Sequence, residues 1–200
     1  MTSVIGTLSN KIGVCARACA ARAAGRFIRN DKGATAVEFS LVALPFIALM
    51  FAILETALCF FAQNYFEDTL ARLARQVRTG QVQKTPPMSA DSFKTQFCSN
   101  LTTLFTCSSV LLDIKTYTDF STAGTTGLTT PLVASGPNIG NLDTSNPSYA
   151  TGKGGDIVVV RAYYPWPVFV NRLGNNLVTM PNGTHLIVAT AAFRNEPFPW

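Results

Sequence analysis

Charged residues are scarce in this sequence. Only 14% of its 200 residues are Asp, Glu, Lys or Arg, whereas 48% are hydrophobic. A chain with so few charges and so many apolar residues does not have the composition of a disordered protein. Its length leaves room for one ordinary domain and an appendage, which excludes a multidomain enzyme. The apolar excess indicates that part of the chain lies in lipid.

The sequence also lacks the motifs of catalysis and of metal binding. His185 is its only histidine, and no second Cys or His pair completes a zinc site. The segment Gly152-Lys153-Gly154-Gly155 lacks the spacing of a phosphate-binding loop, and there is no Gly-x-Ser-x-Gly nucleophile elbow. We therefore expect no catalytic residue, no metal site and no cofactor, which means that the protein is not an enzyme.

Acidic residues are nearly absent from the N-terminal segment. Residues 1–33 contain six Lys and Arg residues but only Asp31 as an acid, so they account for the formal net charge of +5 of the whole chain. A nucleic-acid groove needs Lys and Arg interleaved with aromatic residues along a folded domain. The charge is not distributed in that way, which argues against nucleic acid as a partner.

A long apolar segment follows, from residue 39 to residue 62, and Glu55 is its single charged residue. As a helix it is long enough to cross a hydrocarbon core of roughly 30 Å. It exceeds the apolar region of a cleaved signal peptide, which is about 7–15 residues long. A buried core helix is the alternative, but a domain of this size rarely buries so long a segment on every face. The pattern favours a membrane span.

The helix is expected to continue beyond the membrane. Residues 63–79 have an amphipathic pattern, with apolar residues at spacings of four, three and four: Phe66, Leu70, Leu73 and Val77. Gly80 and the Pro86-Pro87 pair are expected to end this helix. Within the span, Pro45 should bend the helix or leave the carbonyl of Leu41 without its donor.

Flanking charges and cysteines predict the orientation. Six Lys and Arg residues precede the span and four follow it closely, so the positive-inside rule places the N-terminus in the cytoplasm. The downstream domain then lies on the opposite side of the membrane, where an oxidising compartment would let Cys98 and Cys107 form a disulfide. Two isolated thiols or half of a metal site are the alternatives. These patterns predict a single pass through the membrane.

The remainder of the chain has the pattern of a small α+β domain. The expected elements are a helix at 90–98, a strand at 110–120, a long loop at 121–155, strands at 157–164 and 185–193 that pair antiparallel with the first strand, and a helical turn at 169–173. The predicted fold class is α+β, with a long N-terminal transmembrane and amphipathic helix that carries a small antiparallel sheet.

The junction between the basic segment and the span reads Asp31-Lys32-Gly33-Ala34-Thr35-Ala36-Val37-Glu38-Phe39. It resembles the type IV prepilin signal of the tight-adherence (Tad/Flp) pilus. In that family a prepilin peptidase cuts after the Gly, and a Glu stands at the fifth mature position. The resemblance implies cleavage between Gly33 and Ala34, and an assembly role for Glu38. Phe39 stands where the pilins typically have Tyr, a mild departure.

The length after that junction, and the segments 156–167 and 183–198, resemble TadE-like minor pilins, or pseudopilins, of the same system. The resemblance implies a structural protein that takes part in the initiation or modulation of pilus assembly. Its implied partners are other pilins or pseudopilins, the prepilin peptidase, the inner-membrane assembly platform and membrane lipid. Glu55, inside the span, either reaches the membrane interface or pairs with a group on another subunit, and we expect the second.

Three regions follow from these patterns: a basic leader at 1–33, a transmembrane helix with its amphipathic extension at 34–80, and a periplasmic α+β domain at 81–200. A second hypothesis keeps the span as a simple tether. The chain would then be a signal-anchored periplasmic domain, binding or enzymatic, with an uncleaved N-terminus.

Overall fold

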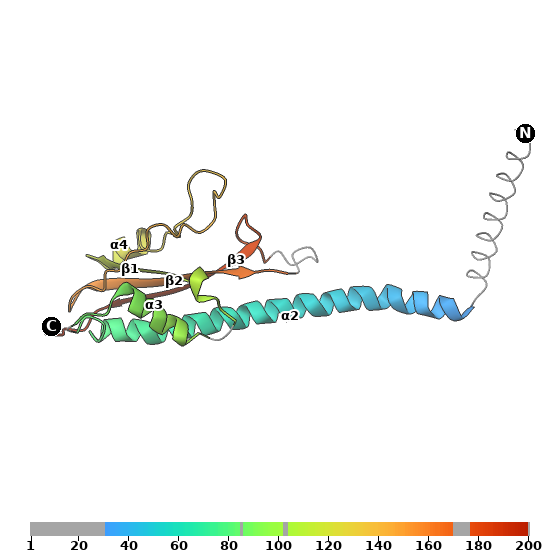
Figure 1. Ribbon diagram of the computed structural model, residues 1–200, viewed down its shortest axis with the longest axis horizontal. Helices are drawn as coiled ribbons and strands as arrows, with labels where there is room; N and C mark the ends of the chain where they lie inside the picture. The colour runs from blue at the N-terminus through green and yellow to red at the C-terminus, as the bar shows by residue number, and fades with distance from the viewer. Residues whose placement is uncertain (1–30, 85, 102–103, 170–176, 200) are drawn as a thin grey trace, which may run out of the picture. The chain divides into compact units, whose positions relative to one another are not determined.

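A computed structural model describes residues 31–84, 86–101, 104–169 and 177–199 of the chain (Figure 1). The chain divides into two compact units, residues 1–50 and 51–200. The described residues of the first unit belong to the first part of helix α2 (Asp31–Arg78), which remains an α-helix through Pro45. The second unit contains the rest of α2 and all other elements.

Helix α2 ends as the sequence predicts. Gly80 adopts a left-handed backbone with φ of 77°. Its N–H donates to the carbonyl of Val77, and the N–H of Gln81 donates to the carbonyl of Gln76. These two bonds form a Schellman motif, which satisfies carbonyls at the helix end. A side chain at Gly80 would also collide with Phe198, since an added Cβ would lie 2.5 Å from its ring.

Three strands form one antiparallel sheet in the order β1-β2-β3. They are β1 (Leu111–Tyr117), β2 (Ile157–Pro167) and β3 (Thr184–Arg194). The α+β fold class is therefore confirmed. The expected pairing is right for β1 with β2, but β3 pairs with β2 and not with β1. Both faces of the central strand β2 are covered and mostly apolar, and Arg161 is its one charged residue.

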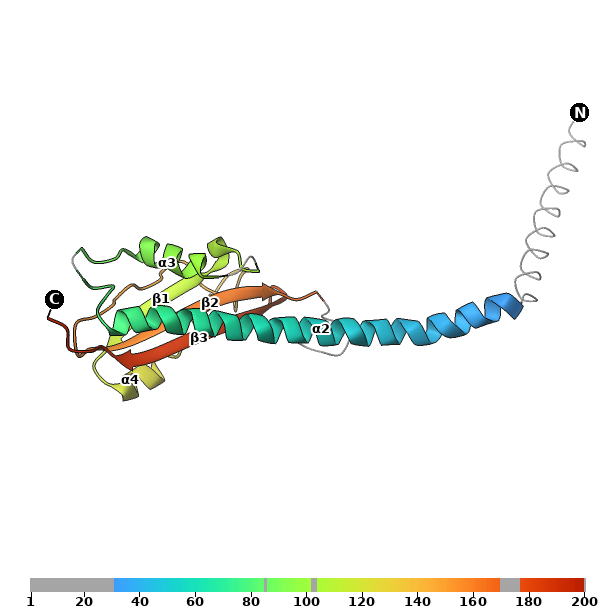
Figure 2. The same ribbon diagram turned by 90° about the horizontal axis from the view of Figure 1, so that it is seen from below.

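In the second unit, the sheet lies between two layers (Figures 1 and 2). The later part of α2 and helix α3 (Ala90–Ser99) pack on one face, and the short helix α4 (Phe120–Thr125) packs on the other. The main core joins α2, α3 and the sheet, and its largest buried members include Phe66, Leu70, Phe93, Phe97, Val158, Val160 and Ile187. The amphipathic pattern of 63–79 thus predicts the buried face of α2 correctly.

Two short elements depart from the expectations. Strand β1 ends at Tyr117, three residues early, because Asp119 caps α4 by accepting a hydrogen bond from the N–H of Thr122 at 2.7 Å. Helix α4 therefore occupies the start of the segment expected to be a loop. Hydrogen bonds from the N–H and the hydroxyl of Thr122 hold the pKa of Asp119 below its ordinary value. The helical turn predicted at 169–173 lies, apart from Phe169, outside the described residues.

Candidate assembly helix and its junction

The residues of the prepilin-like junction lie in the first turns of α2. Gly33 is exposed, and a Cβ added to it would meet no atom within 4 Å. The Gly33–Ala34 peptide bond is helical, and glycine is a poor helix former, which lowers the free energy needed to unwind this turn by about 1 kcal/mol. Gly33, the residue before the predicted cut, is therefore accessible.

Glu38 lies four positions after Ala34, so the two residues share one face of the helix. Its side chain is exposed, and among the residues that the structure describes no cation pairs with its carboxylate. Phe39 beside it is 73% exposed. Both predicted assembly residues thus present their side chains outward from α2, ready for contact with another molecule.

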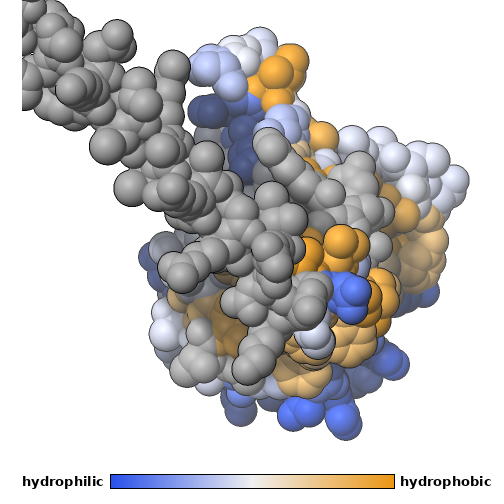
Figure 3. Space-filling model, turned by 90° about the vertical axis from the view of Figure 1, so that its right-hand side faces the viewer, coloured by the Kyte–Doolittle hydropathy of each residue, from blue (hydrophilic) through white to orange (hydrophobic). Residues whose placement is uncertain are grey.

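Helix α2 has an apolar surface that the described residues leave uncovered. An 18-residue window of the helix has a mean hydropathy of 2.4, and only 6% of the window is buried. In the first unit the exposed apolar residues include Val42, Leu44 and Phe46, and in the second they include Phe51, Ile53 and Phe60. Figure 3 shows such hydrophobic residues, in orange, at the molecular surface.

An exposed apolar surface of this length is characteristic of contact with lipid or with other proteins. Its low burial excludes the alternative of a core helix for this segment, since a core helix is mostly buried. By length and composition α2 is long enough to cross a membrane. These properties favour a membrane anchor or a signal helix.

Glu55 is partly satisfied within the chain. Its carboxylate accepts a hydrogen bond from the backbone N–H of Phe169, which follows the end of β2. The side chain is half-buried on α2. Sequence reasoning placed this charge in the span and sought its partner on another subunit, because no local pattern links positions so far apart in the chain. The structure supplies an intramolecular partner; the pairing with another subunit stays a prediction.

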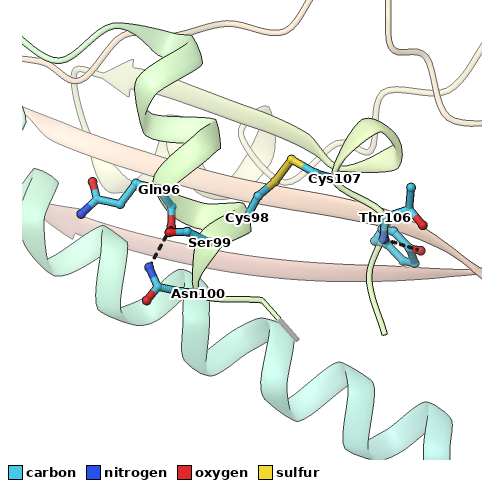
Figure 4. The surroundings of a disulfide bond; sticks show 7 residues. Gln96, Cys98, Ser99, Asn100, Thr106 and Cys107 are labelled. Carbon is cyan, nitrogen blue, oxygen red and sulfur yellow. Dashed lines mark hydrogen bonds between the residues drawn. A yellow bond between two sulfur atoms is a disulfide. The ribbon is translucent and has the colours of Figure 1, made fainter. Parts of the chain in front are cut away.

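The predicted disulfide between Cys98 and Cys107 is present, with a Cα–Cα distance of 5.7 Å. It joins the end of α3 to the short 3-10 helix η1 (Cys107–Ser109) just before β1 (Figure 4). Next to it, the N–H of Thr106 donates to the Tyr164 hydroxyl at 3.2 Å, and the Asn100 side chain donates to the carbonyl of Gln96 at 2.7 Å. The bridge therefore fixes α3 and its loop against the sheet.

Sequence reasoning missed a buried polar cluster on the face of the sheet that carries α4. Arg161 is only 5% exposed and donates to the carbonyls of Gly127 at 3.2 Å and Thr129 at 2.8 Å. Its guanidinium lies 4.9 Å from the ring centre of Tyr163, and its register partner on β1 is Asp113. The sequence contains one signal of this cluster: Arg161 directly follows a run of β-branched residues. A charged side chain in a buried strand needs hydrogen-bond partners, so such a position predicts a buried polar cluster.

Asp113 connects this cluster to the long loop. Its carboxylate accepts a hydrogen bond from the N–H of Ser148 at 2.9 Å and forms an ion pair with Lys115 at 2.8 Å. These bonds and those of Arg161 fix both ends of the loop to the sheet. Within the described ranges there is no group of three or more His, Cys, Asp or Glu that could hold a metal ion.

The fold and the exposed helix define a class of protein: an N-terminal membrane anchor or signal helix that carries a small disulfide-bonded α+β domain. Comparison with protein families is more specific. Residues 33–75 are similar to the family model described as TadE-like protein. No curated protein and no solved structure matches the chain.

Proposed function

We propose that this chain is a minor pilin, or pseudopilin, that takes part in the initiation or modulation of tight-adherence pilus assembly. A prepilin peptidase cuts it after Gly33, and α2 then holds it in the inner membrane. The observation that carries the proposal is the position of the family match, which begins at Gly33 and covers the exposed apolar part of α2.

The proposed topology has the N-terminus in the cytoplasm and the α+β domain in the periplasm. The basic residues before position 34 favour the cytoplasmic side. The Cys98–Cys107 disulfide supports the periplasmic location of the domain, because disulfides persist in oxidising compartments. The protein is then a single-pass subunit that presents its sheet outside the inner membrane.

In the proposed assembly, cleavage creates a positively charged amine at Ala34. Glu38 neutralises such an amine on a neighbouring subunit, since two opposite charges attract strongly where water is excluded. The exposed apolar side chains of α2, Phe39 among them, bind other pilin helices and lipid. The action is mechanical, and no chemistry is assigned to the domain.

The partners in this proposal are other pilins or pseudopilins, the prepilin peptidase and the assembly platform of the inner membrane. Glu55 is a second proposed contact to another subunit. Its test is co-purification of partner pilins with Glu55→Gln. Reduced recovery supports the contact, and unchanged recovery limits Glu55 to interactions within its own chain, such as the bond with Phe169.

Complementation tests the assembly role. In a strain without the gene, the Glu38→Gln variant should be cleaved and membrane-bound but should restore several-fold fewer pili than the natural chain. Asp68→Asn is the matched control, because the exposed Asp68–Arg72 pair contributes little stability. Normal piliation with Glu38→Gln would contradict the role of Glu38. Normal piliation without the gene would favour a tethered periplasmic domain instead.

A further inference from the structure

A groove runs along one side of the second unit, between α2 and strand β3. It consists of two cavities of about 440 Å³ and about 580 Å³, which share Ala71 and Ala191 among their lining residues. Ala74 of α2 and Phe193 of β3 also line it. The small alanine side chains leave room along the helix, so the groove can accept the side chains of another segment.

The backbone of β3 borders this groove. Strand β3 is at the edge of the sheet, beside α2 (Figure 2). Its first half is already covered: the N–H of Leu186 donates to the Thr179 hydroxyl at 2.7 Å, and the Gln63 amide donates to the carbonyl of Val188 at 3.0 Å. Because alternate residues face the same edge, the N–H and C=O groups of Thr190 and Ala192 also point away from β2.

Those groups have no hydrogen-bond partner among the described residues, and Thr190 and Ala192 are both exposed. The opposite edge of the sheet differs, since Ile114 of β1 exchanges hydrogen bonds with Ser148 at 2.8 Å and Ala150 at 2.9 Å. Unpaired edge groups next to a groove are the requirement for binding an extended segment as an added strand.

The charges around the groove indicate what that segment carries. Arg75 lines the groove and is exposed, and no acid pairs with it in the described part of the chain. Arg78 contacts Glu196 at 3.4 Å, with both side chains about half exposed. At the other end, Glu67 is hydrogen-bonded to Gln63. The open charge is thus positive and lies at the Arg75 end.

We propose that the groove binds an extended segment of another protein, which adds to the edge of β3 at Thr190 and Ala192 and places an acidic side chain beside Arg75. Main-chain hydrogen bonds would supply affinity, and the charge would select the sequence.

A second copy of this chain is a poor occupant. Strand β3 runs in the same direction as α2, because Gln63 contacts Val188 and the N–H of Glu196 donates to the carbonyl of Arg78 at 2.9 Å. Two copies joined antiparallel through this edge would have opposed α2 helices, which a shared membrane anchor forbids. This last step rests on the proposed function, whereas the groove and its chemistry do not.

A peptide titration tests the proposal on the full chain in detergent. The probe is acetyl-Val-Thr-Glu-Thr-Val-amide, and its counterpart with Lys in place of Glu is the charge control. With isotope-labelled protein, the amide signals of Thr190 and Ala192 should shift saturably with the Glu peptide. Arg75→Glu should weaken binding roughly fivefold, whereas Arg72→Glu, whose side chain does not line the groove, should bind like the natural chain.

Ala192→Pro removes an edge N–H and should abolish binding, and Thr116→Pro is its control at an exposed residue of β1. If a proline variant unfolds, the comparison of Arg75→Glu with Arg72→Glu still tests the proposal. Absence of saturable shifts at Thr190 and Ala192, equal binding of the Lys peptide, or a response to anionic lipid vesicles alone would overturn the proposal. Because the assay uses purified protein, its result is independent of any role in pilus assembly.

Discussion

At the scale of residues, neighbouring tyrosines on β2 have opposite surroundings. Tyr164 faces the main core, and its hydroxyl accepts a hydrogen bond from Thr106. Tyr163 lies on the other face beside Arg161, fully buried, and its hydroxyl has no hydrogen-bond partner among the described residues. A buried polar group without a partner loses its hydration without compensation. The Tyr163 hydroxyl therefore reduces the stability of the fold, whereas its ring supports it.

Replacing each tyrosine by phenylalanine tests this difference. Tyr163→Phe should leave the free energy of unfolding unchanged or raise it by about 1 kcal/mol, because it removes an unsatisfied hydroxyl. Tyr164→Phe should lower it by about 0.5–1.5 kcal/mol through the lost hydrogen bond. Urea unfolding of both variants in detergent measures the two values. A loss above about 1 kcal/mol in Tyr163→Phe would mean that its hydroxyl is bonded.

The same residue gives the fold a pH dependence. Burial raises the pKa of Tyr163 to about 12, partly opposed by Arg161, from an ordinary value of 10.0. The folded state thus holds the Tyr163 proton more tightly than the unfolded state. The stabilisation that comes from this tighter proton binding is complete below pH 10.0 and is lost as the pH rises through about 12. The decline across that window should be shallower in Tyr163→Phe, and an equal decline would contradict the assignment.

At the scale of elements, sequence patterns predict best where the spacing of apolar residues matches the face that the element buries. The apolar repeat of Phe66, Leu70, Leu73 and Val77 predicts the packed face of α2, and the β-branched runs predict β2 and β3. The order of the strands is not visible in such patterns, because it depends on which faces α2 and α4 cover. The loop after α4 is likewise fixed by distant bonds, such as those of Arg161 with Gly127 and Thr129.

The features of the candidate site likewise divide into those that a local sequence pattern predicts and those that depend on distant contacts. The prediction for Gly33, Glu38 and Phe39 rests on one short motif, and the family match covers the same positions. The contact of Glu55 with Phe169, the buried Arg161 cluster and the groove beside β3 join segments far apart in the chain. No pattern along the sequence encodes such contacts, so they require the structure.

The disulfide carries a prediction for α3. The bridge closes a short loop, with a sequence separation of 9, and should contribute about 2–3 kcal/mol to stability in the chain-entropy model. The double variant Cys98→Ser with Cys107→Ser should be less stable by that amount in thermal or urea unfolding. A reductant should destabilise the natural chain but leave the double variant unchanged. If the reductant affects both equally, its action is not through this bridge.

At the scale of the whole molecule, the formal charge of +5 belongs to the segment before position 34. Cleavage after Gly33 would remove that charge and leave a formally neutral chain, apart from its new termini. In the proposed account the basic residues direct insertion into the membrane. In that account the mature protein makes its contacts through the apolar side chains of α2, Glu38 and the domain.

The N-terminus of the protein in the membrane tests this account most directly. Mass spectrometry of the membrane-extracted chain should find a mature protein that begins at Ala34, and in cells without prepilin peptidase it should find the leader intact. The Gly33→Leu variant should also keep its leader, because the larger side chain hinders approach to the peptide bond. An intact leader on the natural chain in cells that contain the peptidase would contradict the account.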